Sequence, residues 1–119
     1  MRALLVDLDD TLLDYSGGVD ECWSAACETV AAPAGIDTAA LIDAVRKARR
    51  WFWDDPERHR RERVDMLGAW RKIVAHGLER VGMPDESLAA AAAEDFATRR
   101  WVVMRLFPGA AETLGRLRE

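Results

Sequence analysis

Residues 3–14 read ALLVDLDDTLLD, a short apolar run that leads directly into a group of carboxylates. The run at residues 4–6 is continuous rather than alternating, which is typical of a strand buried on both faces of a parallel sheet. Such strands carry functional groups at their carboxyl ends, where the chain leaves the sheet. Asp7 stands at that end, and Asp9 and Thr11 follow in the predicted turn. The stretch therefore predicts an α/β fold with a site at this edge.

Two carboxylates one residue apart at the end of a strand can reach the same small volume. One carboxylate can attack as a nucleophile while the other moves a proton. Repulsion between the two negative charges raises one pKa, as a proton donor near neutral pH requires. Carboxylate oxygens and a turn carbonyl also suit a hard cation such as Mg²⁺. Asp7 and Asp9 are therefore the candidate catalytic and metal-binding residues, and the alternative interpretation is an acidic loop that caps the next helix.

The run Asp7-Leu8-Asp9-Asp10-Thr11 near the N-terminus resembles the first motif of the haloacid dehalogenase-like (HAD) hydrolase superfamily. The resemblance implies that Asp7 is a magnesium ligand and the nucleophile that forms an aspartyl-phosphate. It implies that Asp9 is the general acid/base, with its backbone carbonyl on magnesium. It also implies that Thr11 and Asp10 support the turn and the phosphate. Because the dehalogenases of the family lack the second aspartate, Asp9 favours a magnesium-dependent phosphatase.

Length and composition restrict the class of protein. A chain of 119 residues, half of them hydrophobic, is long enough for one domain with its own core. The net charge of −4 disfavours a general nucleic-acid binder. The apolar run before Asp7 is too short for a signal peptide, and no stretch is long enough to span a membrane. We therefore predict a cytoplasmic protein without nucleic-acid or membrane partners.

The cysteines and histidines suggest no separate chemistry. Cys22 and Cys27 are the only cysteines, and their spacing on a predicted helix points them to different sides. They are predicted to be buried and not bonded to each other. His59 and His76 lack neighbouring ligands in the sequence, which disfavours a metal role for either residue.

Three apolar stripes at helical spacing follow the first motif, at residues 19–30, 41–52 and 66–81. Asp37 is predicted to cap the second helix, and Gly82 is predicted to end the third. A fourth helix is expected over the alanine-rich segment that follows, because alanine has the highest helix propensity. A last helix is expected after the Pro-Gly break that comes next.

The order of these elements also resembles the HAD branch with a helical cap. This resemblance implies the α/β class, with a HAD-like, Rossmann-type core represented mostly by its helical cap: one core strand, about four cap helices and one core helix. The resemblance implies a core start at 1–16, a helical cap at 17–102 and a return to the core at 103–119. The family's later motifs do not appear: a phosphate-binding Ser or Thr, a lysine and an acidic pair. The only lysines, Lys47 and Lys72, fall in the predicted cap. The resemblance thus implies an N-terminal fragment that is inactive alone and tends to self-associate through its unpaired strand.

Charge is distributed unevenly along the chain. Residues 1–45 hold nine acidic residues and one basic residue, whereas residues 46–72 hold ten basic and five acidic residues. An acidic metal site opposite a basic lid is one way to bind a small phosphate ester. Four arginines in 57–63 are predicted to form a solvated helix face, with anion recognition as the alternative: Arg58, Arg60, Arg61 and Arg63. The three aromatic residues at 51–53 cannot all face one core, so at least one lies at a rim, an interface or a pocket.

Two classes of function stay open. The first is the N-terminal part of a magnesium-dependent phosphatase that hydrolyses a small phosphate ester through Asp7 and Asp9. The second is a non-enzymatic helical module that binds an anionic or protein partner through residues 46–72. Asp7 and Asp9 are idle in the second interpretation, so the effect of replacing them separates the two.

Overall fold

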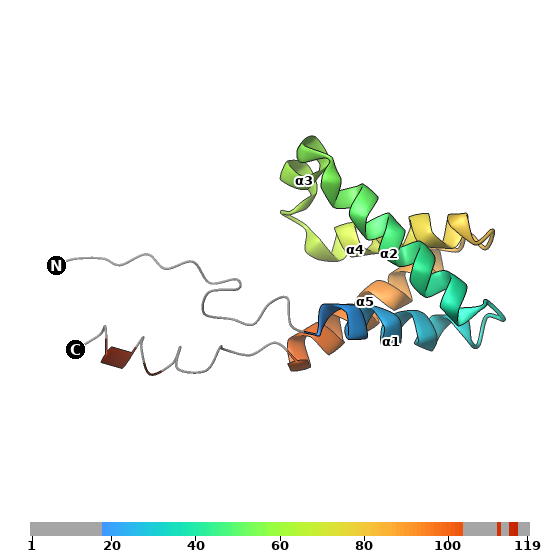
Figure 1. Cartoon of the computed structure of the whole chain (residues 1–119), viewed down its shortest axis with the longest axis horizontal. Helices are drawn as coiled ribbons and strands as arrows, with labels where there is room; N and C mark the ends of the chain where they lie inside the picture. The colour runs from blue at the N-terminus through green and yellow to red at the C-terminus, as the bar shows by residue number, and fades with distance from the viewer. Residues whose placement is uncertain (1–17, 104–111, 113–114, 117–119) are drawn as a thin grey trace.

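The computed structural model describes residues 18–103, 112, 115 and 116. Residues 18–103 fold into five helices, which pack into a bundle (Figure 1): α1 (Val19–Ala31), α2 (Thr38–Asp54), α3 (Pro56–Glu62), α4 (Met66–Arg80) and α5 (Glu86–Val103). Helices α1 and α5 run side by side in opposite directions, and α3 lies at the end of α2 that is farther from them. No helix in the described part of the chain is long and apolar enough to cross a bilayer.

The predicted α/β fold class is wrong, because the described residues form an all-α bundle of five helices and contain no strand. The apolar residues of 18–103 repeat with a helical period, so each element buries one stripe against other helices rather than a face of a sheet. The apolar run at residues 4–6, on which the prediction of a sheet rested, lies outside the described residues. The last helix, predicted to follow the Pro-Gly break, falls largely outside them as well.

The predicted helix ends are confirmed at two positions. The side chain of Asp37 accepts two backbone N–H groups of the first turn of α2, at 3.0 and 3.4 Å. At the end of α4, Gly82 adopts a positive φ of 78°, which glycine tolerates best. The next N–H, that of Met83, then donates to the carbonyl of Leu78 at 2.9 Å. These local signals fix where α2 begins and where α4 ends.

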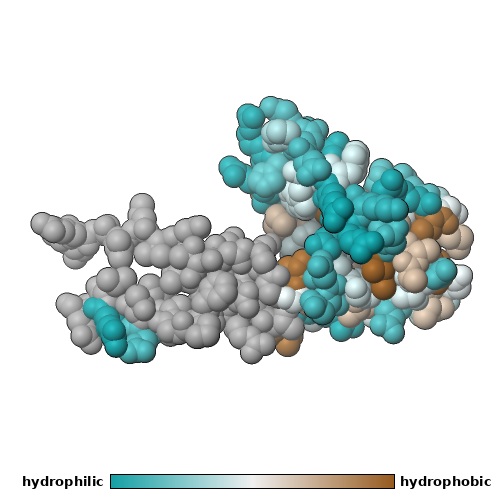
Figure 2. All heavy atoms as spheres, in the orientation of Figure 1, coloured by the Kyte–Doolittle hydropathy of each residue, from teal (hydrophilic) through white to brown (hydrophobic). Residues whose placement is uncertain are grey.

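Helix α3 accounts for the difference between the five helices observed in 18–103 and the prediction of about four for this part of the chain, and it covers most of the helix face predicted at 57–63. Asp55 follows α2 in an extended conformation and accepts the backbone N–H groups of Glu57 and Arg58 at 3.0 and 3.4 Å. Pro56 occupies the first turn, where a missing N–H has no cost. Asp55 and Pro56 thus end one helix and begin another. No residue of α3 is buried, and Figure 2 shows a hydrophilic surface in this region.

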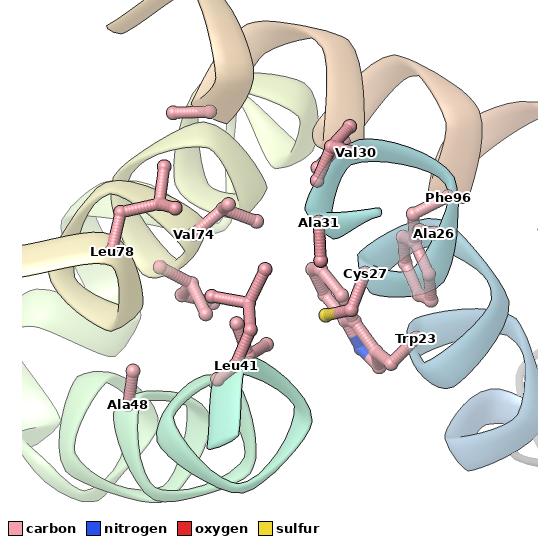
Figure 3. Close-up of a cluster of buried hydrophobic side chains, with 14 of the residues drawn as sticks. Trp23, Ala26, Cys27, Val30, Ala31, Leu41, Ala48, Val74, Leu78 and Phe96 are labelled. Atoms are coloured by element: carbon pink, nitrogen blue, oxygen red, sulfur yellow. The ribbon is translucent and has the colours of Figure 1, made fainter. Parts of the chain in front are cut away.

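The core joins side chains from α1, α2, α4 and α5 (Figure 3). Trp23 of α1 stacks on Phe96 of α5, with ring centroids 3.8 Å apart and planes inclined by 15°. Trp70 of α4 meets the same Phe96 edge to face, at 4.8 Å and 82°. Aromatic pairs in these arrangements add stabilisation beyond the area that they bury. Phe96 therefore links three helices.

Close packing between α2 and α4 depends on a small residue. Gly77 of α4 is buried, and a Cβ placed on it would lie 2.8 Å from a methyl group of Val45 and 3.3 Å from the Val45 Cα. The two helix backbones thus approach too closely for any side chain at position 77. As predicted, Cys22 and Cys27 of α1 are buried and form no disulfide.

The helical bundle begins and ends at the same place. Gly18, just before α1, and Val102, in the last turn of α5, line one groove between these two antiparallel helices. The chain therefore enters the bundle next to the point where it leaves it (Figure 1).

Candidate functional site

The residues of the predicted catalytic motif, Asp7, Asp9, Asp10 and Thr11, lie outside the described residues. Their roles and the magnesium site therefore stay predictions. In the described part of the chain, no group of three or more His, Cys, Asp or Glu side chains is placed to hold a metal ion. The candidate site that the structure describes is instead a cavity of about 660 Å³ among the helices.

The lining of the cavity combines basic and aromatic side chains. Within the described part of the chain, its basic residues are five arginines and one histidine: Arg46, Arg49, Arg50, His59, Arg63 and Arg100. Its apolar wall is mostly aromatic: Val19, Trp23, Trp53, Met66, Trp70 and Phe96. The only acidic lining residue described is Asp20. A space with this excess of guanidinium groups attracts anions.

Three of the arginines come from one side of α2. Arg46, Arg49 and Arg50 are spaced by three and four residues, which places them together on a helix surface. The opposite side of α2 carries the apolar stripe of the core, so the amphipathic pattern that folds the helix also turns these arginines toward the cavity. Arg63 follows α3, and Arg100, only 4% exposed, comes from the last turns of α5. Residues far apart in the sequence thus meet at one site.

Ion pairs with carboxylates neutralise part of this positive charge. Arg49 bonds to Asp20 at 3.0 Å and lies over the Trp23 ring at 5.6 Å. Arg46 pairs with Asp43, and hydrogen bonds from Lys47 and Arg46 hold the pKa of that carboxyl below its usual value. In contrast, Arg50 and Arg63 have no carboxylate partner among the described residues.

The predicted solvated face at residues 57–63 divides into separate roles. Arg60 pairs with Glu57 at 3.0 Å, and Arg61 lies beside Glu62, both with mostly exposed guanidinium groups, as predicted. Arg58 differs from the prediction, because its guanidinium lies 3.9 Å from the centre of the Trp51 ring. It also donates to the backbone carbonyls at the end of α2, at 3.0 and 3.5 Å. Arg58 therefore joins α3 to α2.

The three aromatic residues at positions 51–53 point to different surroundings, as predicted. Phe52 is buried in the core at 3% exposure, whereas Trp51 is 46% exposed and stacks on His76 with centroids 4.2 Å apart. Trp53 lines the cavity. It meets Phe52 and His59 edge to face, at 4.8 and 5.4 Å. Trp53 is thus the one residue of the three that lies at a pocket. Both histidines, His59 and His76, have aromatic neighbours.

Neither lysine of the sequence is part of the cavity. Lys47 pairs with Asp43 at 2.9 Å, and Lys72 pairs with Glu62 at 2.8 Å. The hydrogen bond from Lys72 lowers the pKa of Glu62. Both lysines are mostly exposed and lie on the helices that were predicted to carry them, α2 and α4.

A second hollow of about 600 Å³ lies between α1 and α5. Among the described residues that line it, the one cation is Arg99, which pairs with Asp95 and donates to Thr29 at 3.3 Å. The Asp95 carboxylate raises the pKa of Arg99. Since this charge is already matched, the groove lacks the positive excess that distinguishes the arginine-lined cavity.

Comparison of the sequence and structure with protein-family models, curated proteins and solved structures finds no match in any of the three.

Proposed function

We propose that the chain is part of a magnesium-dependent phosphatase that resembles the HAD hydrolases and acts on a small phosphate ester. The observation that carries the proposal is the arginine-lined cavity, in the same chain as the Asp7-Asp9 motif. Val19 and Asp20, which follow this motif closely in the sequence, are themselves lining residues. An anionic substrate suits both features, because arginine binds phosphate with paired, charge-assisted hydrogen bonds.

In the proposed reaction, an Asp7 oxygen attacks the phosphorus and the bond from phosphorus to the ester oxygen breaks. Asp9, protonated at that stage, gives its proton to the departing alcohol. Asp9 then takes a proton from water, whose oxygen attacks the phosphorus and releases inorganic phosphate, so that Asp7 is restored. Magnesium, held by the Asp7 carboxylate and the Asp9 carbonyl, would neutralise charge on the transferred group.

We further propose that the 119 residues alone give no turnover. Asp7 and Asp9 add negative charge to a site that must stabilise a phosphoryl group, and one side chain and one carbonyl hold magnesium weakly. Lys47 and Lys72 pair with carboxylates of the helices, which supports the view that neither serves the reaction. The remaining groups would come from a longer product of the same gene or from a partner chain. The unpaired cysteines fit the predicted cytoplasmic location.

The test is phosphate release from a panel of phosphate esters, with and without magnesium, by a chain extended past Glu119 along its own reading frame. We expect magnesium-dependent hydrolysis that Asp7→Asn abolishes, because an amide cannot act as the nucleophile. Asp14→Asn, a carboxylate change just beyond the motif, is the matched control and should retain activity. Full activity in Asp7→Asn, or none in the extended wild type, would contradict the proposal.

The second candidate is a non-enzymatic module that binds an anionic partner through residues 46–72. It is favoured by one specific observation: this range supplies four of the five cavity arginines, and the cavity needs neither motif aspartate. Under this interpretation, Asp7→Asn and Asp9→Asn leave the function of the protein intact. The extended-chain assay therefore decides between the two.

A further inference from the structure

We infer that the cavity binds an aromatic phosphate monoester, with the ring between tryptophans and the phosphate on the arginines. Binding of this compound does not depend on the proposed function. Only its role as the substrate rests on that function. The cavity itself lies within residues 18–103, so its ligand preference can be measured without turnover.

Two arginines line the cavity without a carboxylate partner in the described part of the chain, Arg50 and Arg63. Like charges that line one space repel each other, and Asp20, the only acidic lining residue among those the structure describes, already pairs with Arg49. A dianionic group in the cavity would relieve this repulsion and accept hydrogen bonds from both guanidinium groups. A neutral ligand would leave the repulsion in place.

Two half-buried tryptophans line the cavity, Trp53 and Trp70. Their neighbouring rings within the described residues meet them edge to face, at inclinations of 72–84° for Trp53 and 82° for Trp70. Trp23 differs, because its ring is stacked on Phe96 at 15°. Trp53 and Trp70 therefore have no parallel partner among the described rings, and a flat ligand ring can supply one.

The size of the cavity agrees with a ligand larger than a single phosphate. Its volume of about 660 Å³ is typical of pockets that hold small organic molecules. Inorganic phosphate would meet the arginines but would leave the tryptophans in contact with water. A ring that carries a phosphate contacts both the arginines and the tryptophans, which is why we infer an aryl ester rather than an aliphatic one.

Calorimetric titration of the 119-residue protein in magnesium-free buffer tests the inference. The probes are 1-naphthyl phosphate, glycerol 2-phosphate, inorganic phosphate and 1-naphthol. We expect 1-naphthyl phosphate to bind about tenfold more tightly than each of the others, because only it meets both walls. Equal affinity for inorganic phosphate would overturn the aromatic part of the inference, and equal affinity for 1-naphthol would overturn the anionic part.

Substitutions locate the binding site. Arg50→Ala should weaken the binding of 1-naphthyl phosphate about tenfold and reduce its salt dependence. The matched control is Arg80→Ala, which removes an exposed arginine of α4 that does not line the cavity. Circular dichroism verifies the fold of each variant. Equal losses in the two variants, or no loss in Arg50→Ala, would contradict the inferred site.

A third variant, Trp53→Leu, tests the wall that the ring contacts. It should reduce the affinity for 1-naphthyl phosphate toward that for glycerol 2-phosphate, while the affinity for inorganic phosphate stays unchanged. If this variant does not fold, the four probes still decide the aromatic part on the wild-type protein. Failure of the phosphatase proposal is seen separately, as unchanged activity of the extended Asp7→Asn chain, and leaves these titrations intact.

Discussion

The two sides of α2 differ in their surroundings, since one packs into the core and the other borders the cavity. On the core side, Val45 meets Gly77 of α4 so closely that no side chain fits at position 77. On the other side, long arginines and Trp53 surround about 660 Å³ of open space. Small residues let helix backbones approach, whereas large charged side chains resist burial and keep their neighbours apart. The difference teaches that side-chain size along α2 decides where this helix packs closely against a neighbour and where it borders the cavity.

The largest expected effect comes from Phe96, which belongs to both the core and the cavity. Phe96→Ala removes the stacking partner of Trp23 and the edge contact with Trp70, so we expect a loss of about 3–5 kcal/mol in the free energy of unfolding. Urea denaturation measures it. Trp101→Ala, on the same helix but 79% exposed, is the control and should stay within about 0.5 kcal/mol. Similar losses in both variants would contradict this division of α5.

Gly77→Ala tests the close packing between α4 and the core side of α2. Alanine gains about 1 kcal/mol in helix propensity over glycine, but its Cβ would clash with Val45, so we expect a net loss of about 1–3 kcal/mol. Thermal unfolding measures the change. In a Val45→Ala background the loss should be smaller, because one of the clashing methyl groups is gone. A stabilised Gly77→Ala protein would show that the helices can separate at no cost.

Arg58 sharpens the comparison, because it lies near α2 but does not line the cavity. Arg58→Ala should cost about 1 kcal/mol of stability, since it removes the contact with Trp51 and two hydrogen bonds to the end of α2. Arg60→Ala, which removes only an exposed pair with Glu57, should stay within about 0.5 kcal/mol. Neither change should alter the affinity for 1-naphthyl phosphate. A stability loss in Arg58→Ala as small as that in Arg60→Ala would restore the solvated-face interpretation.

The smallest effect near neutral pH concerns Cys27 of the core. Burial raises the pKa of its thiol from 9.0 to about 12, against a minor opposing effect of Arg49. The thiol ionises more readily in the unfolded chain, so its contribution to stability is complete below pH 9.0 and is lost progressively as the pH rises toward about 12. Unfolding measured between these pH values should show a steeper loss in the wild type than in Cys27→Ala. Parallel curves would contradict the raised pKa.

Most of the helices could be predicted from the sequence because their signals are local. Asp37 and Gly82 mark their helix ends through contacts within a few residues, and the apolar stripes repeat over several turns. The sequence predicts a helix face at 57–63 but does not separate it from its neighbours as a helix of its own. Asp55 and Pro56 do so, because a capping aspartate followed by a proline in the first turn begins a new helix. The α/β class was wrong because it was extended from a short apolar run to the chain as a whole.

The cavity could be predicted only in part. The excess of basic residues in 46–72 was visible, and anion recognition was considered for the arginines of 57–63. The greater share of the cavity charge comes from Arg46, Arg49 and Arg50, whose spacing was a usable signal. Their meeting with Arg63 and Arg100 depends on how α2, α3 and α5 pack. No local sequence pattern predicts such long-range proximity, so the structure was needed to find it.

The adjacency of Gly18 and Val102 at one groove has a consequence for the evolution of such chains. A helical unit whose two ends lie together can be accepted into a surface loop of a host protein without pulling that loop open. The same unit can be exchanged for another of different lining while the host stays unchanged. Variation in ligand preference then requires no redesign of the residues that carry out the chemistry. The position of its two ends thus allows the bundle to be replaced as a unit.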